Sequence, residues 1–331
     1  MHELDRHRAL ERLVERPVDG RHPTGADLLL ESEAAVQEGA DHVSSIFRAV
    51  PVRVRYLTDP ACSWSWAAEP LVRRLMVEFG DSLEFTWVMG GLARDYTAAP
   101  GVYPWLLAHW LEVAGESRMP IDPLLWKEAP IKSTYPACMA VKAAQEQADD
   151  GGYRYLRNVR EGLLCLRRKL DTTEPLVEAA RESGLNVERF RIGLQSHAIV
   201  EAFGVDLEEA RTVPDAVRAA GKAVDAHGSG DRLPFPSAVF IGDDGERHGV
   251  YGQASYDQLR GAAESAGAKP VGAEPPGVLE ALRRFGRMAT LEVEQVCRLP
   301  EPRALAELWR LAADFEVKPV RVLTGWLWEP V

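Results

Sequence analysis

The sequence lacks the features of a membrane, secreted or nucleic-acid-binding protein. No apolar run in its 331 residues reaches the length of a membrane span, because glycine, proline or a charge interrupts each one. The opening stretch, MHELDRHRALERLVER, is densely charged and contains no apolar signal core. Lys and Arg number 39 against 50 Asp and Glu, and the net charge of -11 opposes broad binding to nucleic acid or anionic lipid. We therefore expect a cytoplasmic protein.

Cysteine is also scarce. The chain has four cysteines, widely separated along the sequence, at Cys62, Cys138, Cys165 and Cys297. Four are too few for a disulfide scaffold of this size, and their spacing, without a nearby histidine cluster, does not favour a zinc site. We expect reduced thiols and no bound metal.

What is present is a normal globular composition, with 46% hydrophobic residues and room for two domains. The stretch VRVRYLT alternates like a strand, the following segment to Gly80 carries a helical stripe, and SLEFTWVMGG reads as a second strand. Pro70 predicts a kink or a late helix start. The unit should be a parallel, right-handed β–α–β.

A helical insertion is expected over about 100–230. Its leucine stripe predicts one helix over 155–170, which carries Cys165 off the stripe. Strand texture returns in SAVFIGDDGERHGVYG, which predicts a hairpin, and a short helix follows at about 255–265.

The two ends of the chain differ from this central part. Residues 1–50 predict an N-terminal helical extension. Residues 275–331 predict helix, short extended piece, two helices and a hairpin wing, the order of a winged-helix-like segment. Counted over 274–331, eight basic residues face nine acidic ones. Because DNA binding needs a basic recognition surface, we favour packing or protein contact for this segment.

The chemistry of interest lies in the sequence TDPACSWSWAAEP. Cys62 falls at a predicted helix start, where unpaired backbone N–H groups and the helix dipole favour a thiolate and predict a pKa below the ordinary value. The alternative is a buried cysteine that packs as a small hydrophobe. Asp59, three residues earlier, could cap the helix, tune the thiolate or be a solvated turn residue.

A second motif, LPFPSAVFI, places a proline directly before a strand. Proline cannot donate to a sheet ladder, so it suits a strand start or an edge, and a cis peptide bond would explain it. Pro236 adjoins the strand residues, and Pro234 is the competing candidate.

Together these segments resemble the DsbA-like branch of the thioredoxin superfamily, the group of FrnE-type and SpxH/YjbH-type proteins. TDPACSWSWAAEPLVRRL is similar to that group's Asp-Pro-x-Cys-x-Trp-Cys-Trp segment, and FTWVMGGLARDY, STYPACMAVKAA, SGLNVERF and FPSAVF resemble its other segments. The resemblance covers roughly 51–265. It implies an α/β thioredoxin-like fold over 51–270, with the inserted helices roofing the active-site cleft.

The resemblance also implies site residues. Cys62 matches the attacking cysteine and Pro236 the cis-proline, whereas Ser65 stands where the family has its resolving cysteine. Phe235 would place its backbone opposite Cys62. We assign Trp64 to the substrate groove.

Without a second sulfur the motif cannot close its own disulfide, so an outside thiol must release any mixed disulfide. The Ser65 hydroxyl could still donate to the thiolate. Cys165 is a possible internal resolver, although a structural role suits it better.

Three functions follow. The first is a thiol–disulfide oxidoreductase or isomerase acting through a monothiol mixed disulfide on a protein or small thiol. The second is a non-catalytic adaptor that binds a protein partner. The third is a transferase or isomerase holding a thiol cofactor. We expect no tightly bound cofactor, with glutathione or another low-molecular-weight thiol as the molecule this site could take.

Two other features are given structural interpretations. Trp105, His109 and Trp110 form an aromatic patch that we interpret as core packing. Gly90 and Gly91 follow a strand but lack the spacing of a phosphate-binding loop.

Overall fold

The computed structural model describes residues 50–98, 101–226 and 230–331. The chain from residue 50 onward forms one compact unit. The predicted N-terminal extension lies outside the described residues.

The central sheet has the strand order β2-β1-β5-β6. The β1 and β2 strands are parallel, with Val52 opposite Leu83, while β5 runs antiparallel to both β1 and β6. This confirms the predicted parallel unit followed by a hairpin. The strands are β1 (Val52–Thr58), β2 (Leu83–Met89), β5 (Ser237–Ile241) and β6 (Arg247–Tyr251).

Two helices connect β1 to β2. They are α3 (Ser63–Ala67) and α4 (Glu69–Phe79), with the short 3-10 helix η1 (Gly80–Ser82) after them. The break falls at Ala68 because Pro70 occupies the first turn of α4, where its missing N–H costs nothing. The chain leaves α4 through Gly80 at a φ of 50°. The expected interruption near Pro70 is thus a division into two helices.

The insertion after β2 is helical, as expected. It contains η2 (Tyr96–Ala98), α5 (Val102–Ser117), α6 (Leu125–Glu128), α7 (Tyr135–Gln145), α8 (Tyr153–Leu164), α9 (Thr173–Glu182), α10 (Val187–Leu194), α11 (His197–Arg211) and α12 (Asp215–Ala219), then the short strands β3 (Val224–Asp225) and β4 (Asp231–Arg232). The helix predicted over 155–170 extends too far at its C-terminal end. It ends at Leu164, and Arg167 takes a left-handed φ of 52° that an α-helix cannot continue through.

The last part of the chain begins with α13 (Tyr256–Ser265), which contacts α4 and the β5–β6 hairpin. A second, smaller hydrophobic core then holds together α14 (Val278–Phe285), β7 (Met288–Ala289), α15 (Thr290–Val296), α16 (Glu301–Ala313), β8 (Val317–Val322) and β9 (Gly325–Pro330). We call residues 278–330 the C-terminal segment. Its sheet order is β7-β9-β8.

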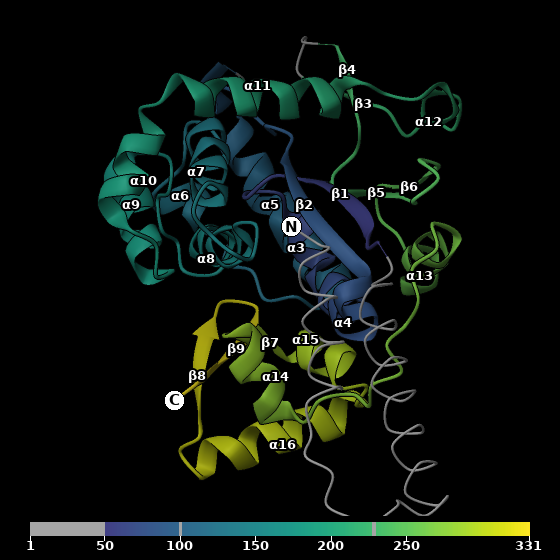
Figure 1. The fold of residues 1–331 in the computed structure, drawn as a ribbon. Helices are drawn as coiled ribbons and strands as arrows, with labels where there is room; N and C mark the ends of the chain where they lie inside the picture. The colour runs from purple at the N-terminus through teal and green to yellow at the C-terminus, as the bar shows by residue number, and fades with distance from the viewer. Residues whose placement is uncertain (1–49, 99–100, 227–229) are drawn as a thin grey trace, which may run out of the picture. The chain divides into compact units, whose positions relative to one another are not determined.

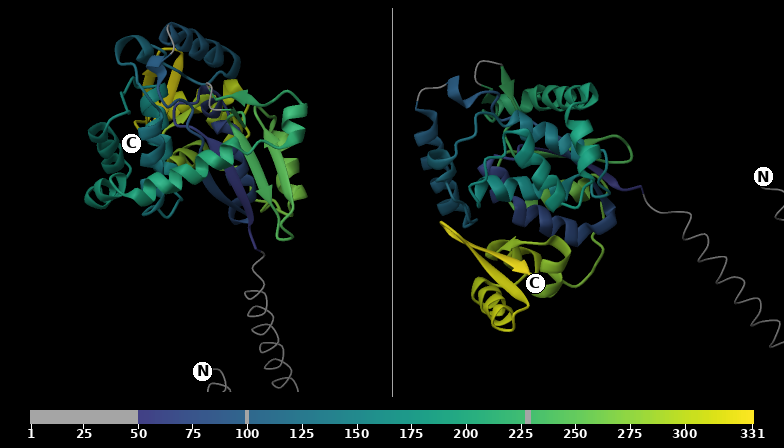
Figure 2. Two further views of the ribbon diagram at one scale, coloured as in Figure 1. Left: turned by 90° about the horizontal axis from the view of Figure 1, so that it is seen from above. Right: turned by 90° about the vertical axis from the view of Figure 1, so that its left-hand side faces the viewer.

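The C-terminal segment packs on the central part through α15 and α4. Figure 1 shows it in yellow and green beside α4, with the insertion helices α7 to α11 in teal beyond β2. The right-hand view of Figure 2 shows the same segment next to the blue α4. None of the helices in the described ranges is long and apolar enough to cross a membrane.

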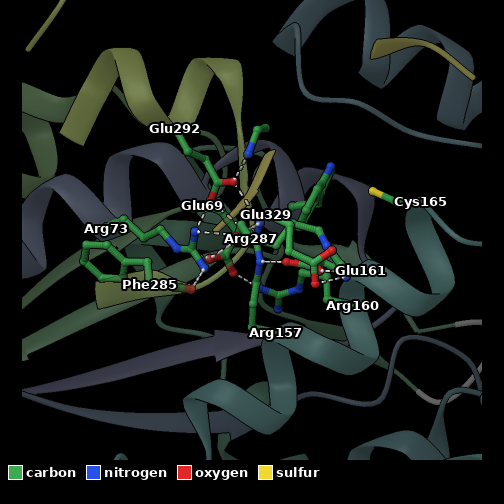
Figure 3. Close-up of polar contacts among 12 residues, drawn as sticks. Glu69, Arg73, Arg157, Arg160, Glu161, Cys165, Phe285, Arg287, Glu292 and Glu329 are labelled. Atoms are coloured by element: carbon green, nitrogen blue, oxygen red, sulfur yellow. Dashed lines mark hydrogen bonds and ion pairs between the residues drawn. The ribbon is translucent and has the colours of Figure 1, made fainter. Parts of the chain in front are cut away.

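Buried charges join these parts (Figure 3). We call the set the ionic network; its members are Glu69 and Arg73 from α4, Arg157, Arg160 and Glu161 from α8, and Arg287, Glu292 and Glu329 from the C-terminal segment.

Glu292 is the meeting point of the ionic network. It accepts from Arg157 at 2.8 Å and pairs with Arg73 at 3.1 Å, although all three side chains are buried. Glu69 pairs with Arg160 and accepts from the Tyr153 hydroxyl at 2.8 Å. Although burial opposes ionisation, Arg160, Arg157 and Arg73 hold the pKa of Glu69 below its ordinary value.

Candidate functional site

Cys62 lies in the loop between β1 and α3, where it is the N-cap of that short helix. Its sulfur accepts from the Ser65 backbone N–H at 3.4 Å and lies 3.8 Å from the Phe235 carbonyl oxygen. The Phe235–Pro236 peptide bond is cis. The structure therefore brings Cys62, Ser65, Phe235 and Pro236 into one small region.

Gly90 makes this arrangement possible. A Cβ at position 90 would lie 1.9 Å from the tip of the Phe235 ring, so only glycine leaves room for that ring. The neighbouring Gly91 has a φ of 63°. The glycine pair after β2 thus serves close packing, a reason that its sequence context alone did not indicate.

Asp59 is fully buried, and its carboxylate holds the loop that carries Cys62 through hydrogen bonds. Its carboxylate accepts from the Ala61 N–H at 2.8 Å, the Leu92 N–H at 2.6 Å and the Thr134 hydroxyl at 2.7 Å, and the Cys138 thiol lies 3.3 Å away. A solvated turn residue is excluded. Asp59 fixes the loop between β1 and α3 against the start of the insertion.

The expected low pKa of Cys62 is wrong in direction. Burial raises the pKa of the thiol above its ordinary value, and the negative charge of Asp59 adds to the rise. The Ser65 hydroxyl and amide and the positive charge of Arg232 act in the opposite direction without reversing it. Only 6% of Cys62 is exposed, so the loss of hydration outweighs the effect of a five-residue helix.

A cavity of about 410 Å³ opens beside Cys62. Trp64, assigned to the groove from sequence, lines it together with Cys62 and Phe235, whereas Trp66 is fully buried. Pro236 is not part of this lining. It borders a much smaller space on the side of Tyr56.

The aromatic patch of α5 also borders the cavity, so its interpretation as core is confirmed for the buried Trp110 and is wrong for Trp105. Trp105, His109 and Trp110 all line it, and Trp105 is 62% exposed. The Trp105 ring stacks on His109 with centroids 5.1 Å apart. Burial lowers the pKa of His109, so its neutral form is favoured.

Cys165 lies apart from this cavity. It follows the last residue of α8, its thiol lies 3.2 Å from the Pro120 carbonyl oxygen, and Figure 3 shows it beside the ionic network. All four cysteines are free and buried. Ser65 supplies no second sulfur; its hydroxyl is buried without a hydrogen bond of standard geometry to any described residue.

Arg232 and Tyr96 are site residues that the sequence gave no signal for. Both line the cavity and both are more than nine-tenths buried. Neither belongs to a motif, and they come from distant parts of the chain. Within the described ranges, no cluster of three potential metal ligands is present.

Comparisons with known proteins agree with this geometry. A thioredoxin family model matches residues 56–214. A solved structure from Nitrosomonas europaea, with a suggested protein disulfide isomerase activity, is 19% identical with a TM-score of 0.53. It covers 65% of this chain and 97% of that one. The chain is therefore a DsbA-like protein of the thioredoxin superfamily, as the sequence predicted.

Similarity to individual proteins indicates a narrower group within the thioredoxin superfamily. The ClpXP adapter protein SpxH of Halalkalibacterium halodurans is 26% identical over 289 residues, covering 84% of this chain and 88% of that protein. SpxH of Shouchella clausii is 27% identical over 291 residues with the same coverage. Within the superfamily, this chain is of the SpxH type.

Proposed function

We propose that this protein is an adaptor that binds a protein partner and presents it to a ClpXP-type protease. The burial of Cys62 carries the proposal. A thiol–disulfide catalyst needs an accessible thiolate, whereas burial and Asp59 keep Cys62 protonated near neutral pH. The sequence alone ranked the enzyme first, and the raised pKa reverses that order.

The extent of the similarity to SpxH proteins supports the same proposal. Coverage of 84% of this chain exceeds the share that residues 51–270 make up, so the similarity to SpxH is not confined to the thioredoxin-like part. The C-terminal segment is bound to α4 and α8 by the ionic network. A rigidly attached second module suits a protein that must hold two partners in a fixed relation.

The adaptor proposal is tested in cells of the source strain. Deleting this chain should lengthen the half-life of at least one ClpXP-dependent protein in a pulse–chase proteome. Wild-type chain and Cys62→Ala should restore that half-life equally. Restoration by the wild type alone would contradict a non-catalytic role, and so would a proteome whose half-lives do not change.

The reactivity of Cys62 is tested directly by alkylation of the folded full chain across pH. Peptide mass spectrometry separates Cys62 from the other three cysteines. The midpoint for Cys62 should lie above that of free cysteine, about 8.5. A midpoint below that value would favour a thiol–disulfide enzyme over the adaptor.

Thiol exchange remains the second candidate, because Cys62 lines a cavity and its sulfur lies beside the Phe235 carbonyl. In that case the Cys62 thiolate attacks oxidised glutathione, forms the S–S bond of a mixed disulfide and releases one glutathione thiolate. Ser65 cannot release the adduct, so it should persist until a thiol is added. Intact mass would show one glutathionyl group on wild type and none on Cys62→Ser.

A further inference from the structure

Arg232 is a buried cation that lines the cavity beside Cys62 and forms no ion pair with the described residues. Its exposed fraction is 9%, and its guanidinium stacks 4.5 Å above the Phe235 ring. One guanidinium nitrogen donates to the Leu233 carbonyl at 2.9 Å. Across residues 50–98, 101–226 and 230–331, no carboxylate forms an ion pair with it. A buried guanidinium with one hydrogen bond leaves most of its donors unused.

Tyr96 lines the same cavity but adds no hydrogen-bond donor to it. Its exposed fraction is 5%, and its hydroxyl is fully buried with no hydrogen-bond partner among the described residues. A ligand in the cavity therefore meets the Tyr96 ring, while Arg232 supplies the N–H donors.

The rest of the cavity is largely apolar and of small-molecule size. Its volume of about 410 Å³ falls in the range of ligand pockets. The walls are chiefly the aromatic and aliphatic side chains of Trp64, Leu92, Trp105, Leu106 and Phe235, and the polar part of the lining includes Asp225, Gln253 and His109. A buried cation without a paired charge costs free energy, and its place in the wall of a largely apolar cavity indicates that a ligand supplies that charge.

We propose that this cavity binds a small carboxylic acid with an apolar or aromatic body, whose carboxylate is held by Arg232. Guanidinium is suited to a carboxylate because its N–H groups match the two oxygens. The apolar body would lie among the tryptophans. This site concerns a small ligand, does not use the Cys62 thiol and goes beyond the adaptor proposal.

The first test uses the full chain with 3-phenylpropionate and its neutral amide, 3-phenylpropionamide. Calorimetry and quenching of tryptophan fluorescence report binding. The acid should bind at least about tenfold more tightly than the amide, because a hydrogen bond to a charged group is worth about 1.5–3 kcal/mol. Equal binding of acid and amide would overturn the proposal.

Variants separate the charge from the fold. Arg232→Met keeps the apolar stem and should lose the preference for the acid, whereas the exposed Arg94→Met, outside the cavity lining, should keep it. If Arg232→Met does not fold, Arg232→Lys, which loses the two-pronged guanidinium, should weaken acid binding severalfold in a folded protein. Unchanged acid binding in these variants would overturn the assignment.

Two further arms identify the source of the carboxylate. Cys62→Ala changes one lining side chain, but it should keep the preference for 3-phenylpropionate over its amide, because the thiol does not hold the carboxylate. That result distinguishes this site from a thiol site and leaves the adaptor question separate. An N-acetylated tripeptide ending in phenylalanine is compared with its C-terminal amide. Binding confined to the peptide acid would overturn the small-acid assignment in favour of a chain terminus.

Discussion

The molecule buries arginine in two contrasting ways. In the ionic network, Arg73 and Arg157 both meet Glu292, and Arg160 meets Glu69. In the cavity beside Cys62, Arg232 meets an aromatic ring and a backbone carbonyl. Each of these three network arginines is paired with a carboxylate, whereas Arg232 forms no ion pair with any residue that the structure describes.

The difference separates structure from function. Paired buried charges need no further partner, so removing one member leaves its opposite stranded and destabilises the fold. An unpaired buried cation lowers the stability of the empty protein, because its desolvation is not compensated. Burial accordingly lowers the pKa of Arg232, whereas the pKa of Arg157 is well above its ordinary value.

The largest expected effect is the loss of folding stability when a paired buried charge of the ionic network is removed. Glu69→Ala removes the carboxylate that Arg160 contacts and leaves a buried arginine unpaired. The free energy of unfolding, measured by urea titration, should fall by about 3–5 kcal/mol. Glu174→Ala, which breaks the exposed pair with Arg191, should change it little. Similar losses in both variants would contradict a special role for burial.

A smaller effect is expected where packing supports the cavity. In Gly90→Ala the added methyl group collides with the Phe235 ring that lies beneath Arg232. The variant should lose about 1–3 kcal/mol of stability and weaken 3-phenylpropionate binding. Gly115→Ala in α5 meets open space, so its stability should be equal to wild type or higher. Wild-type stability and binding in Gly90→Ala would show that the ring moves freely.

The stability that Glu69 contributes through the ionic network is expected to depend on pH. Because the pKa of Glu69 is lowered in the folded protein, the unfolded chain takes up its proton first as the pH falls. Its contribution is therefore present above the unfolded pKa, about 4.3, and is lost as the pH falls through the folded value. The stability difference between wild type and Glu69→Gln should shrink from about pH 6 to about pH 3. A constant difference would contradict this origin.

The smallest effect on folding stability is expected when the unpaired charge of Arg232 is removed in the protein without ligand. Arg232→Met removes an uncompensated charge while its thioether still covers the Phe235 ring. Stability should change by less than about 1 kcal/mol, in either direction. A loss like that of Glu69→Ala would mean that Arg232 is structural, and the comparison would fail.

Local patterns in the sequence were enough for much of the fold. The alternation of VRVRYLT, the stripe ending at Gly80 and the SAVFI strand each depend on neighbours in sequence, and the structure has all three. The helix predicted over 155–170 was wrong at its C-terminal end, because no residue type there indicates the left-handed conformation of Arg167. The positions of Trp64 and Phe235 followed from the family resemblance.

The electrostatics could not be predicted in the same way. The pKa of Cys62 depends on burial by other segments and on Asp59, whose own partners Leu92 and Thr134 are distant in sequence. Arg232 is one of many arginines in the sequence, and only the fold shows that it is buried without an acid. The pKa of Cys62 and the unpaired state of Arg232 both depend on burial by segments that are distant in sequence. The spacing of residues in a single sequence does not indicate that burial.

Arg160 gives the ionic network a wider consequence. It contacts Glu69 and also donates to the Thr58 hydroxyl at 2.7 Å and the Asp59 carbonyl at 3.4 Å. Cutting the chain after α13 would remove Glu292 and leave Arg73 and Arg157 without it. The C-terminal segment is thus not separable from the rest of the fold. In evolution and in protein engineering, we expect the C-terminal segment and the Cys62 loop to be retained together.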